Sequence, residues 1–151
     1  MQIIDLLIPE RVQVGVTVRS KKRLLEAAAK VLADDEGELE ARAVYSCLCN
    51  REKIGATGLG YGVAIPHGRM AEAETAVGAF LQLREPIEFD SPDLKPVDLV
   101  FAMVVPEAFH DEYLVLLAQL AEMFDDVSQR QKLRDADDVG EILAMIESWQ
   151  K

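Results

Sequence analysis

The sequence predicts one α/β domain over residues 1–151, with three layers in which helices cover both faces of a mixed β-sheet. Segments with the period of a strand interleave with segments with the period of a helix. Segments 77–84 and 97–105 are apolar on both faces, as strands in the middle of a covered sheet are. A further strand segment at 87–89 leaves no room for a crossover helix between each pair, so at least one strand pair must be antiparallel.

One strand and two helices are predicted in the N-terminal third of the chain. Residues 11–19 alternate valine with small or polar residues, which predicts a strand with one buried face. Ser20 is placed to cap a helix over 21–33, which Gly37 would end. Residues 38–53 repeat the helical spacing of apolar side chains, so a second helix is expected to pack near the first.

Three more helices are predicted after the last strand. Residues 111–124 carry acidic side chains in the first turn and an apolar stripe at helical spacing. Ser128 would cap a short helix within 126–136, and residues 137–150 would close the chain as a helix. The stripe of the first of these helices is expected to be buried and consists of Leu114, Leu117, Ala118, Ala121 and Phe124.

The chain is acidic, with a formal net charge of −11, and the excess is uneven. Residues 1–69 contain 10 basic and 9 acidic side chains, whereas residues 70–151 contain 6 and 18. Such a surface repels phosphate backbones and anionic lipids, so we expect no nucleic-acid partner and no membrane insertion. No apolar run reaches the roughly 18 to 20 residues that span a bilayer, and the N-terminus lacks a signal-peptide pattern, so a cytoplasmic protein is expected.

Cys47 and Cys49 are two residues apart, and the chain has no other cysteine. This spacing predicts reduced thiols rather than a disulfide framework or a metal knuckle.

His67 stands between Pro66 and Gly68 in the segment GVAIPHGR, residues 62–69. Proline fixes φ before the histidine and glycine leaves space beside the ring, so the imidazole is expected to be held in one place. The glycines upstream would let the backbone turn several N–H groups toward an anion, although the segment matches no phosphate-loop or dinucleotide pattern. From these residues alone, segment 55–68 is either an anion-binding loop or a connector rich in turns.

The chemistry open to His67 is narrow. A metal site needs three or four ligands, and the other candidates, His110 and the two cysteines, lack a metal-binding spacing, so we expect no metal and no cofactor. No serine or cysteine motif for nucleophilic catalysis lies nearby. The imidazole itself, with an ordinary pKa near ~6.5, can attack a phosphoryl group at neutral pH and release it again.

The segment NREKIGATGLGYGVAIPHGR, residues 50–69, closely resembles the active-site segment of the mannitol/fructose-class IIA proteins of the bacterial phosphoenolpyruvate-dependent phosphotransferase system. The segment IIDLLIPERVQVGVTVRSKKRLLEAAAKVLA, residues 3–33, is similar to the nitrogen-regulatory subgroup of that family. PIEFDSPDLKPVDLVFAMVVP and LLAQLAEMF add support. The resemblance spans nearly the whole chain and implies a single IIA type-2 domain.

The resemblance implies that His67 accepts phosphate from the histidine-containing phosphocarrier protein, which would make the chain a phosphotransferase component. It also implies that Arg51 and Thr57 support the phosphate, because a guanidinium chelates phosphate oxygens and a hydroxyl completes their coordination. Without the resemblance, Arg51 is interpreted as a cation at a helix C-terminus and Thr57 as a turn residue.

The sequence departs from the family pattern at one position. Relatives often carry a second histidine near the start of the helix after VVP, facing the first across the pocket, and Tyr113 aligns with it. His110 lies three residues earlier and could substitute only if the helix has already begun there. Tyr113 is therefore assigned the pocket position, where its phenol can donate a hydrogen bond to a phosphate oxygen or to His67.

The resemblance leads to a phosphohistidine carrier that regulates its targets through the phosphorylation state of His67. Potassium transporters or sensor kinases are the targets it implies. Two alternatives stay open: a regulatory binding module of the same fold that is never phosphorylated, and a sugar-specific IIA component that passes phosphate to a IIB domain.

Overall fold

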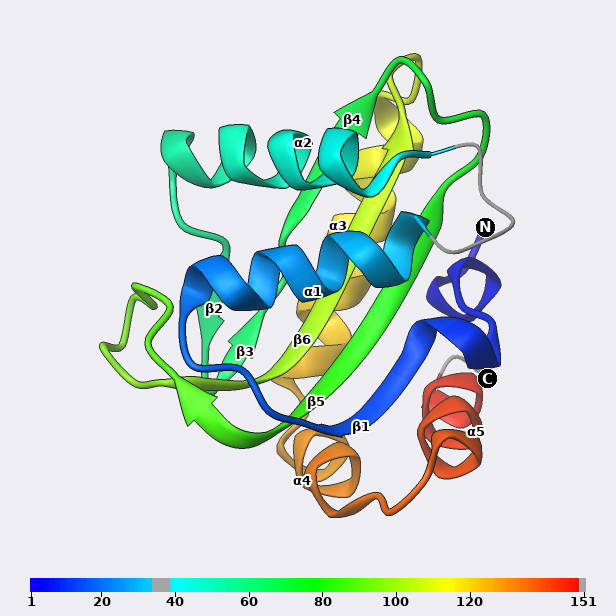
Figure 1. The fold of residues 1–151 in the computed structure, drawn as a ribbon. Helices are drawn as coiled ribbons and strands as arrows, with labels where there is room; N and C mark the ends of the chain where they lie inside the picture. The colour runs from blue at the N-terminus through cyan, green and yellow to red at the C-terminus, as the bar shows by residue number, and fades with distance from the viewer. Residues whose placement is uncertain (34–38, 150–151) are drawn as a thin grey trace.

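The computed structural model describes residues 1–33 and 39–149, so the helix end expected at Gly37 lies outside the described residues. Helices and strands form three layers in a single α/β unit, as predicted (Figure 1). The described helices are η1 (Ile3–Leu6), η2 (Pro9–Arg11), α1 (Lys21–Ala33), α2 (Ala41–Ile54), α3 (Asp111–Asp125), α4 (Val127–Asp135) and α5 (Val139–Trp149). The described strands are β1 (Val12–Val16), β2 (Gly58–Gly60), β3 (Val63–Ala64), β4 (His67–Met70), β5 (Val77–Ile87) and β6 (Val97–Pro106).

The sheet is mixed and has the order β1-β5-β6-β3-β2, with β4 also paired to β6. β5 and β6 are antiparallel, which confirms the expected antiparallel pair, whereas β3 and β4 both join β6 in parallel. β5 continues as one strand to Ile87, with an irregular register after Gln82, where the sequence predicted two separate segments. The β5–β6 pair therefore forms the middle of the sheet.

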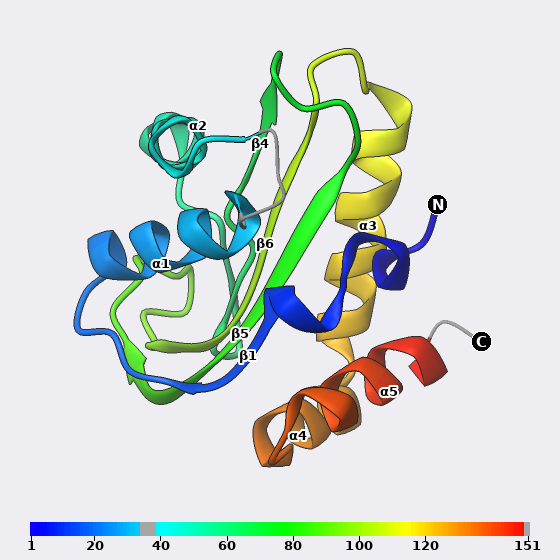
Figure 2. The same cartoon turned by 45° about the vertical axis from the view of Figure 1, so that its right-hand side comes forward.

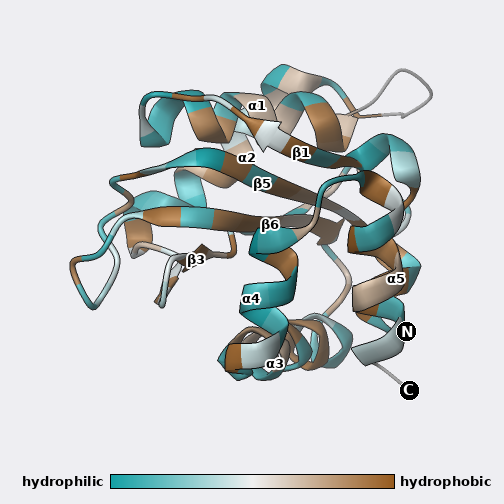
Figure 3. Ribbon diagram, turned by 90° about the horizontal axis from the view of Figure 1, so that it is seen from below, coloured by the Kyte–Doolittle hydropathy of each residue, from teal (hydrophilic) through white to brown (hydrophobic). Residues whose placement is uncertain are grey.

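The two faces of the sheet bury different sets of side chains. Along β6, Val100, Ala102 and Val104 pack with α1 and α2. Phe101 and Met103 alternate with them and pack with α3, α4 and α5 on the other face. Figure 3 shows the sheet between these two layers of helices, with apolar residues in brown along β5 and β6. The prediction that 97–105 is buried on both faces is confirmed.

The start of α1 agrees with the sequence prediction. The Ser20 hydroxyl accepts a hydrogen bond from the Arg23 backbone N–H at 3.1 Å, which satisfies one of the unpaired donors of the first turn. None of the helices in the described ranges is long and apolar enough to cross a membrane.

The valines of β1 do not share one buried face, as the sequence had predicted. Val12 and Val14 pack in the core beside α3 and α5, whereas Val16 packs in the core beneath α1. Gly15, at φ +68°, lies where the register with β5 shifts. Such a bulge reverses the side on which the following residues point, and the alternation of valines alone does not reveal it.

α3 has the predicted bounds to within one residue, but the predicted buried stripe is only partly right: Phe124 is buried and Leu117 is partly buried, whereas the other three members are exposed. Leu116, Leu120 and Met123 are buried, whereas Leu114 is 64% exposed. The sequence offers two overlapping apolar stripes at helical spacing, and only the contact with the sheet face, seen in Figure 2, selects between them. Ala118 and Ala121 of the predicted stripe are also exposed.

α4 is capped by Asp126 and not by Ser128. The Asp126 side chain accepts a hydrogen bond from the Gln129 backbone N–H at 3.1 Å, and the helix begins at the next residue. Ser128 then lies inside the first turn, where its own N–H needs a partner and cannot cap the helix.

Candidate functional site

His67 is the first residue of β4 and lies in the sheet rather than in a loop. β3 ends at Ala64, Pro66 interrupts the strand because it has no N–H, and β4 resumes beside β6 with His67 opposite Met103. The Met103 N–H donates to the Pro66 carbonyl at 2.9 Å, so the interruption itself is tied to β6. The backbone on both sides of His67 is therefore fixed.

The glycines of the turn between β2 and β3 do not line the pocket at His67, whereas Gly68 does. Gly60, Tyr61 and Gly62 have φ of +93°, +58° and +80° and make a tight turn between β2 and β3. The turn is held by Asp93, whose carboxylate accepts the Tyr61 N–H at 2.9 Å, and by Arg134, which donates to the Tyr61 carbonyl. This turn is absent from the lining of the pocket at His67, so the connector interpretation holds for it.

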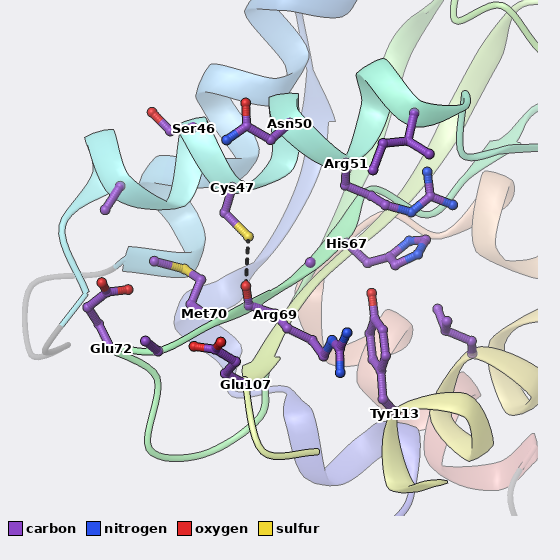
Figure 4. A pocket seen from close by; sticks show the side chains of 15 residues that line it. Ser46, Cys47, Asn50, Arg51, His67, Arg69, Met70, Glu72, Glu107 and Tyr113 are labelled. Carbon is purple, nitrogen blue, oxygen red and sulfur yellow. Dashed lines mark hydrogen bonds between the residues drawn. The ribbon is translucent and has the colours of Figure 1, made fainter. Parts of the chain in front are cut away.

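A pocket of about 830 Å³ opens between α2, β4 and the start of α3, with His67 in its wall. Figure 4 shows the His67 ring between the side chains of Arg51 and Tyr113, with the Arg69 side chain beside that of Tyr113. The lining also includes Cys47, Ile54, Gly68, Glu72, Glu107 and Leu117. Two guanidinium groups and one imidazole therefore share one end of a solvent-open hollow.

A backbone carbonyl fixes the tautomer of His67. Nδ1 lies 2.5 Å from the Ile65 carbonyl oxygen, which can only accept, so the ring proton is on Nδ1. In the neutral ring, Nε2 then carries the lone pair. His67 is only 6% exposed, and its side chain is reached through the pocket rather than from open solvent.

Burial is the main influence on the protonation of His67 and lowers the pKa of its imidazole. The Ile65 carbonyl raises this pKa, the nearby Arg51 lowers it, and Glu52 raises it, each by less than burial does. The net pKa lies below the ordinary value of 6.5, so the ring is neutral at pH 7 and its lone pair is available.

Arg51 lies in the last turn of α2 and lines the pocket. Its Nη1 donates to the Gly55 carbonyl at 2.7 Å, which is the role of a cation at a helix C-terminus. The same side chain points toward His67 (Figure 4). The helix-end role and a phosphate role are compatible, because a guanidinium has five N–H donors and this bond uses one.

Thr57 is buried beside the pocket but does not line it. Its backbone N–H and its hydroxyl both donate to the Glu52 carboxylate, at 2.8 and 2.6 Å. The single hydroxyl proton is thus engaged, which places Thr57 in a supporting position. Direct contact of its hydroxyl with a phosphate stays a prediction.

Tyr113 lies in the first turn of α3 and lines the pocket, with its ring centroid 5.7 Å from that of His67. His110 directly precedes the helix, and its Nδ1 lies 3.3 Å from Arg69 Nη1 instead of facing His67. Between the two candidates, the pocket position is occupied by Tyr113. Burial raises the pKa of the Tyr113 phenol above its usual value, so the group stays a hydrogen-bond donor.

Two charged residues at the site were not identified from the sequence. Arg69 follows His67 by two residues, and residues two apart on a strand share a face. This spacing identifies Arg69 as a site residue only once residues 67–70 are known to form a strand. The Arg69 guanidinium lies 5.7 Å from the Tyr113 ring and donates to the Phe109 carbonyl at 3.3 Å. Glu52, the second missed residue, adjoins Arg51 in the helix.

The pocket contains no candidate metal centre in the part of the chain that the structure describes. No three histidine, cysteine, aspartate or glutamate side chains within residues 1–33 and 39–149 are grouped so as to hold an ion. Both cysteines are free thiols. Among the described residues that line the pocket, the arginines are Arg51 and Arg69.

Comparison with known proteins places this geometry in a family. The family model described as "Phosphoenolpyruvate-dependent sugar phosphotransferase system, EIIA 2" matches residues 5–149. A nitrogen regulatory protein of Bradyrhizobium diazoefficiens is 41% identical over 146 residues, covering 97% of this chain and 95% of that protein. A nitrogen regulatory protein of Pseudomonas aeruginosa is 43% identical over 132 residues, covering 87% of this chain and 86% of that protein.

A solved structure of a nitrogen regulatory protein has the same fold as this chain. The nitrogen regulatory protein IIA-Ntr of Neisseria meningitidis superposes with a TM-score of 0.91 at 43% sequence identity, covering 95% of this chain and 98% of that one. The resemblance found in the sequence is confirmed over most of the length of both. The chain belongs to the EIIA 2 family of the phosphoenolpyruvate-dependent sugar phosphotransferase system and is a homologue of the nitrogen regulatory proteins.

Proposed function

We propose that this protein is a phosphohistidine carrier in which Nε2 of His67 accepts a phosphoryl group from the histidine-containing phosphocarrier protein. Membership of the family gives a phosphocarrier or regulatory role of the transferase type. The observation that carries the finer proposal is the hydrogen bond from Nδ1 to the Ile65 carbonyl, because it puts the lone pair on Nε2 in a ring that lines the pocket.

The transfer balances without any further reactant. The Nε2 lone pair forms a bond to phosphorus, the nitrogen–phosphorus bond of the donor breaks, and the donor nitrogen recovers its electron pair. The proton stays on Nδ1, and its hydrogen bond to the Ile65 carbonyl stabilises the ring as the ring becomes more cationic. Arg51 and Arg69 are positioned to neutralise the oxygens, and the Tyr113 hydroxyl to donate to one of them.

The rim of the pocket supports docking of a protein donor. Ile54, which lines the pocket at the end of α2, is 84% exposed, and Leu114, which follows Tyr113 in the first turn of α3, is also exposed. Exposed apolar side chains beside a buried reactive group are typical of a surface that a partner covers. The acidic character of the chain favours a partner with a basic or neutral face.

We further propose that the phosphorylation state of His67 selects the regulatory targets. A phosphoryl group adds about 1.5 to 2 negative charges at pH 7 between two arginines, which changes the potential of the whole rim. Potassium transporters or sensor kinases are the target classes proposed from the family resemblance. Support for this part is the similarity to proteins named as nitrogen regulatory proteins.

The test is incubation of the purified protein with phosphoenolpyruvate, enzyme I and the phosphocarrier. The wild type is compared with His67→Ala and with a matched control, His110→Ala, which removes the other histidine of the chain. An acid-labile, alkali-stable label is expected on the wild type and on the control, and none on His67→Ala.

Each of the other outcomes would contradict one part of the proposal. Equal labelling of His67→Ala would contradict the assignment of His67. Absence of label on all three proteins would favour a binding module that is never phosphorylated. Onward transfer from the labelled protein to a IIB domain would favour a sugar-specific IIA component.

A further inference from the structure

The Glu52 carboxylate accepts contacts from three donors. Its side chain is only 5% exposed and accepts the Thr57 N–H, the Thr57 hydroxyl and the Lys21 ammonium, the last at 3.0 Å. Lys21 comes from the start of α1 and also lies over the Phe89 ring at 4.5 Å. Burying a carboxylate is costly unless it has partners. The three partners of Glu52 therefore hold this part of the chain in a specific arrangement.

Thr57 connects Glu52 to Ile65, the residue whose carbonyl is bonded to His67. Its carbonyl accepts the Ile65 N–H at 3.0 Å, and the carbonyl of Ile65 in turn accepts the Nδ1 proton of His67 at 2.5 Å. Ile65 is thus bonded on both sides, once to Thr57 and once to the catalytic ring. Four consecutive hydrogen bonds and ion pairs connect α1 to the imidazole.

We infer that Glu52 is a positioning residue for His67: by fixing Thr57 and Ile65, it keeps the carbonyl in place that confines the ring proton to Nδ1. The catalytic part of this inference rests on the proposed function, whereas the effect on the tautomer does not. Glu52 is not among the residues that line the pocket.

The side chains predict a graded response to substitution. Glu52→Ala removes the acceptor for both Thr57 donors. Glu52→Gln can keep two of the three contacts, because its carbonyl accepts the Thr57 N–H while its amide donates to the Thr57 hydroxyl, which reverses its role. Glutamine should therefore rescue the positioning, although it lacks the charge. Glu26→Ala is the matched control, since it removes a glutamate paired with Arg23 on α1 at 3.0 Å.

The tautomer of His67 is read first, by nitrogen-15 NMR of the unphosphorylated protein with labelled histidine. The wild type, Glu52→Gln and Glu26→Ala are expected to show the Nδ1–H form alone, and Glu52→Ala a mixture with the Nε2–H form. The rate of phosphoryl acceptance should fall roughly 10- to 100-fold in Glu52→Ala only. A residue that merely stabilised the fold would lower the melting temperature without changing the tautomer ratio.

A single Nδ1–H tautomer in folded Glu52→Ala, together with a wild-type rate, overturns the inference. If Glu52→Ala does not fold, Glu52→Asp decides it, because the shorter side chain keeps the negative charge and draws the carboxylate away from both Thr57 donors; the Nδ1–H form alone in that variant overturns the inference as well. If no protein is phosphorylated, the wild type included, the proposed function fails, and the tautomer ratio still decides the role of Glu52.

Discussion

The rings of His67 and Tyr113 face one another across the pocket with 5.7 Å between their centroids and an angle of 59° between their planes. This tilted contact limits the space around the imidazole and puts the phenol in the same pocket. Because Tyr113 comes from α3 and His67 from β4, the start of α3 and the sheet together define the site.

Tyr113→Phe tests the hydrogen bond that the phenol is proposed to donate. The variant keeps the ring contact with His67 and loses only the hydroxyl. A hydrogen bond to a charged group contributes about 1.5 to 3 kcal/mol, so its loss should make the formation of phosphohistidine less favourable by roughly 10- to 100-fold. The phosphorylation equilibrium with the phosphocarrier measures this, and an unchanged equilibrium would show that the hydroxyl makes no such bond.

Arg51→Gln tests the role of the guanidinium in neutralising the phosphoryl group. The rate of acceptance should fall by about 100-fold, the usual loss when one preorganised donor to a developing negative charge is removed. Quenched-flow labelling measures the rate. Arg23→Gln makes the same change of charge at a position on α1 that is paired with Glu26, and it serves as the control. Equal rates in the two variants would remove Arg51 from the site.

The low pKa of His67 makes the reaction resistant to mild acid. Because burial lowers this pKa below 6.5, the acceptance rate should stay constant as the pH falls to 6.5 and decline only at lower pH. Arg51→Gln should raise the midpoint, since Arg51 contributes to lowering it. NMR titration of the His67 ring protons gives the midpoint directly, and a value above 6.5 in the wild type would contradict the burial argument.

The same shift makes the fold less stable in acid. Between pH 6.5 and the lower pKa of the folded protein, the unfolded chain binds a proton that the folded chain does not, so the free energy of unfolding decreases as the pH falls through this window. Above pH 6.5 this contribution is fully present. Urea denaturation at several pH values should show that His67→Gln lacks this part of the pH dependence, and parallel curves for the two proteins would contradict it.

Gly68 is required by the close approach of α2. A β-carbon at this position would lie 2.4 Å from Cys47 Sγ, so Gly68→Ala should destabilise the protein by about 1 to 3 kcal/mol. Cys47→Ala removes the sulfur and leaves only ordinary contacts at 3.5 Å or more, so the double variant should recover most of the loss. A double-mutant cycle by thermal denaturation measures the coupling, and additive losses would show that the sulfur is not the obstacle.

The sequence predicted the layers, the helices and the histidine, because these depend on patterns within one segment. Where two patterns overlap, it failed: α3 carries two apolar stripes, and β1 carries alternating valines whose phase is reversed at Gly15. Both outcomes are decided by contacts between segments distant in sequence.

The residues of the site also differ in whether the sequence reveals them. His67, Arg51 and Tyr113 could be found from motif and alignment, and the structure brings all three to one pocket. Arg69 depends on His67 being in a strand, which the Gly-Pro composition of the segment conceals. The position of Glu52 depends on Lys21 and Thr57, which come from two other segments, and no local pattern reports it.

Under the proposed function, the placement of His67 on a strand hydrogen-bonded to β6 has a consequence for how a target distinguishes the two states of the protein. Because β6 holds the backbone of His67 in place, phosphorylation of the ring should not move that backbone. The phosphorylated and unphosphorylated molecules should therefore have nearly the same shape. A target then distinguishes them by electric field, which at physiological ionic strength decays over a Debye length of about 8 Å. Recognition of this kind must occur within a few residues of the imidazole, and it weakens as salt is added.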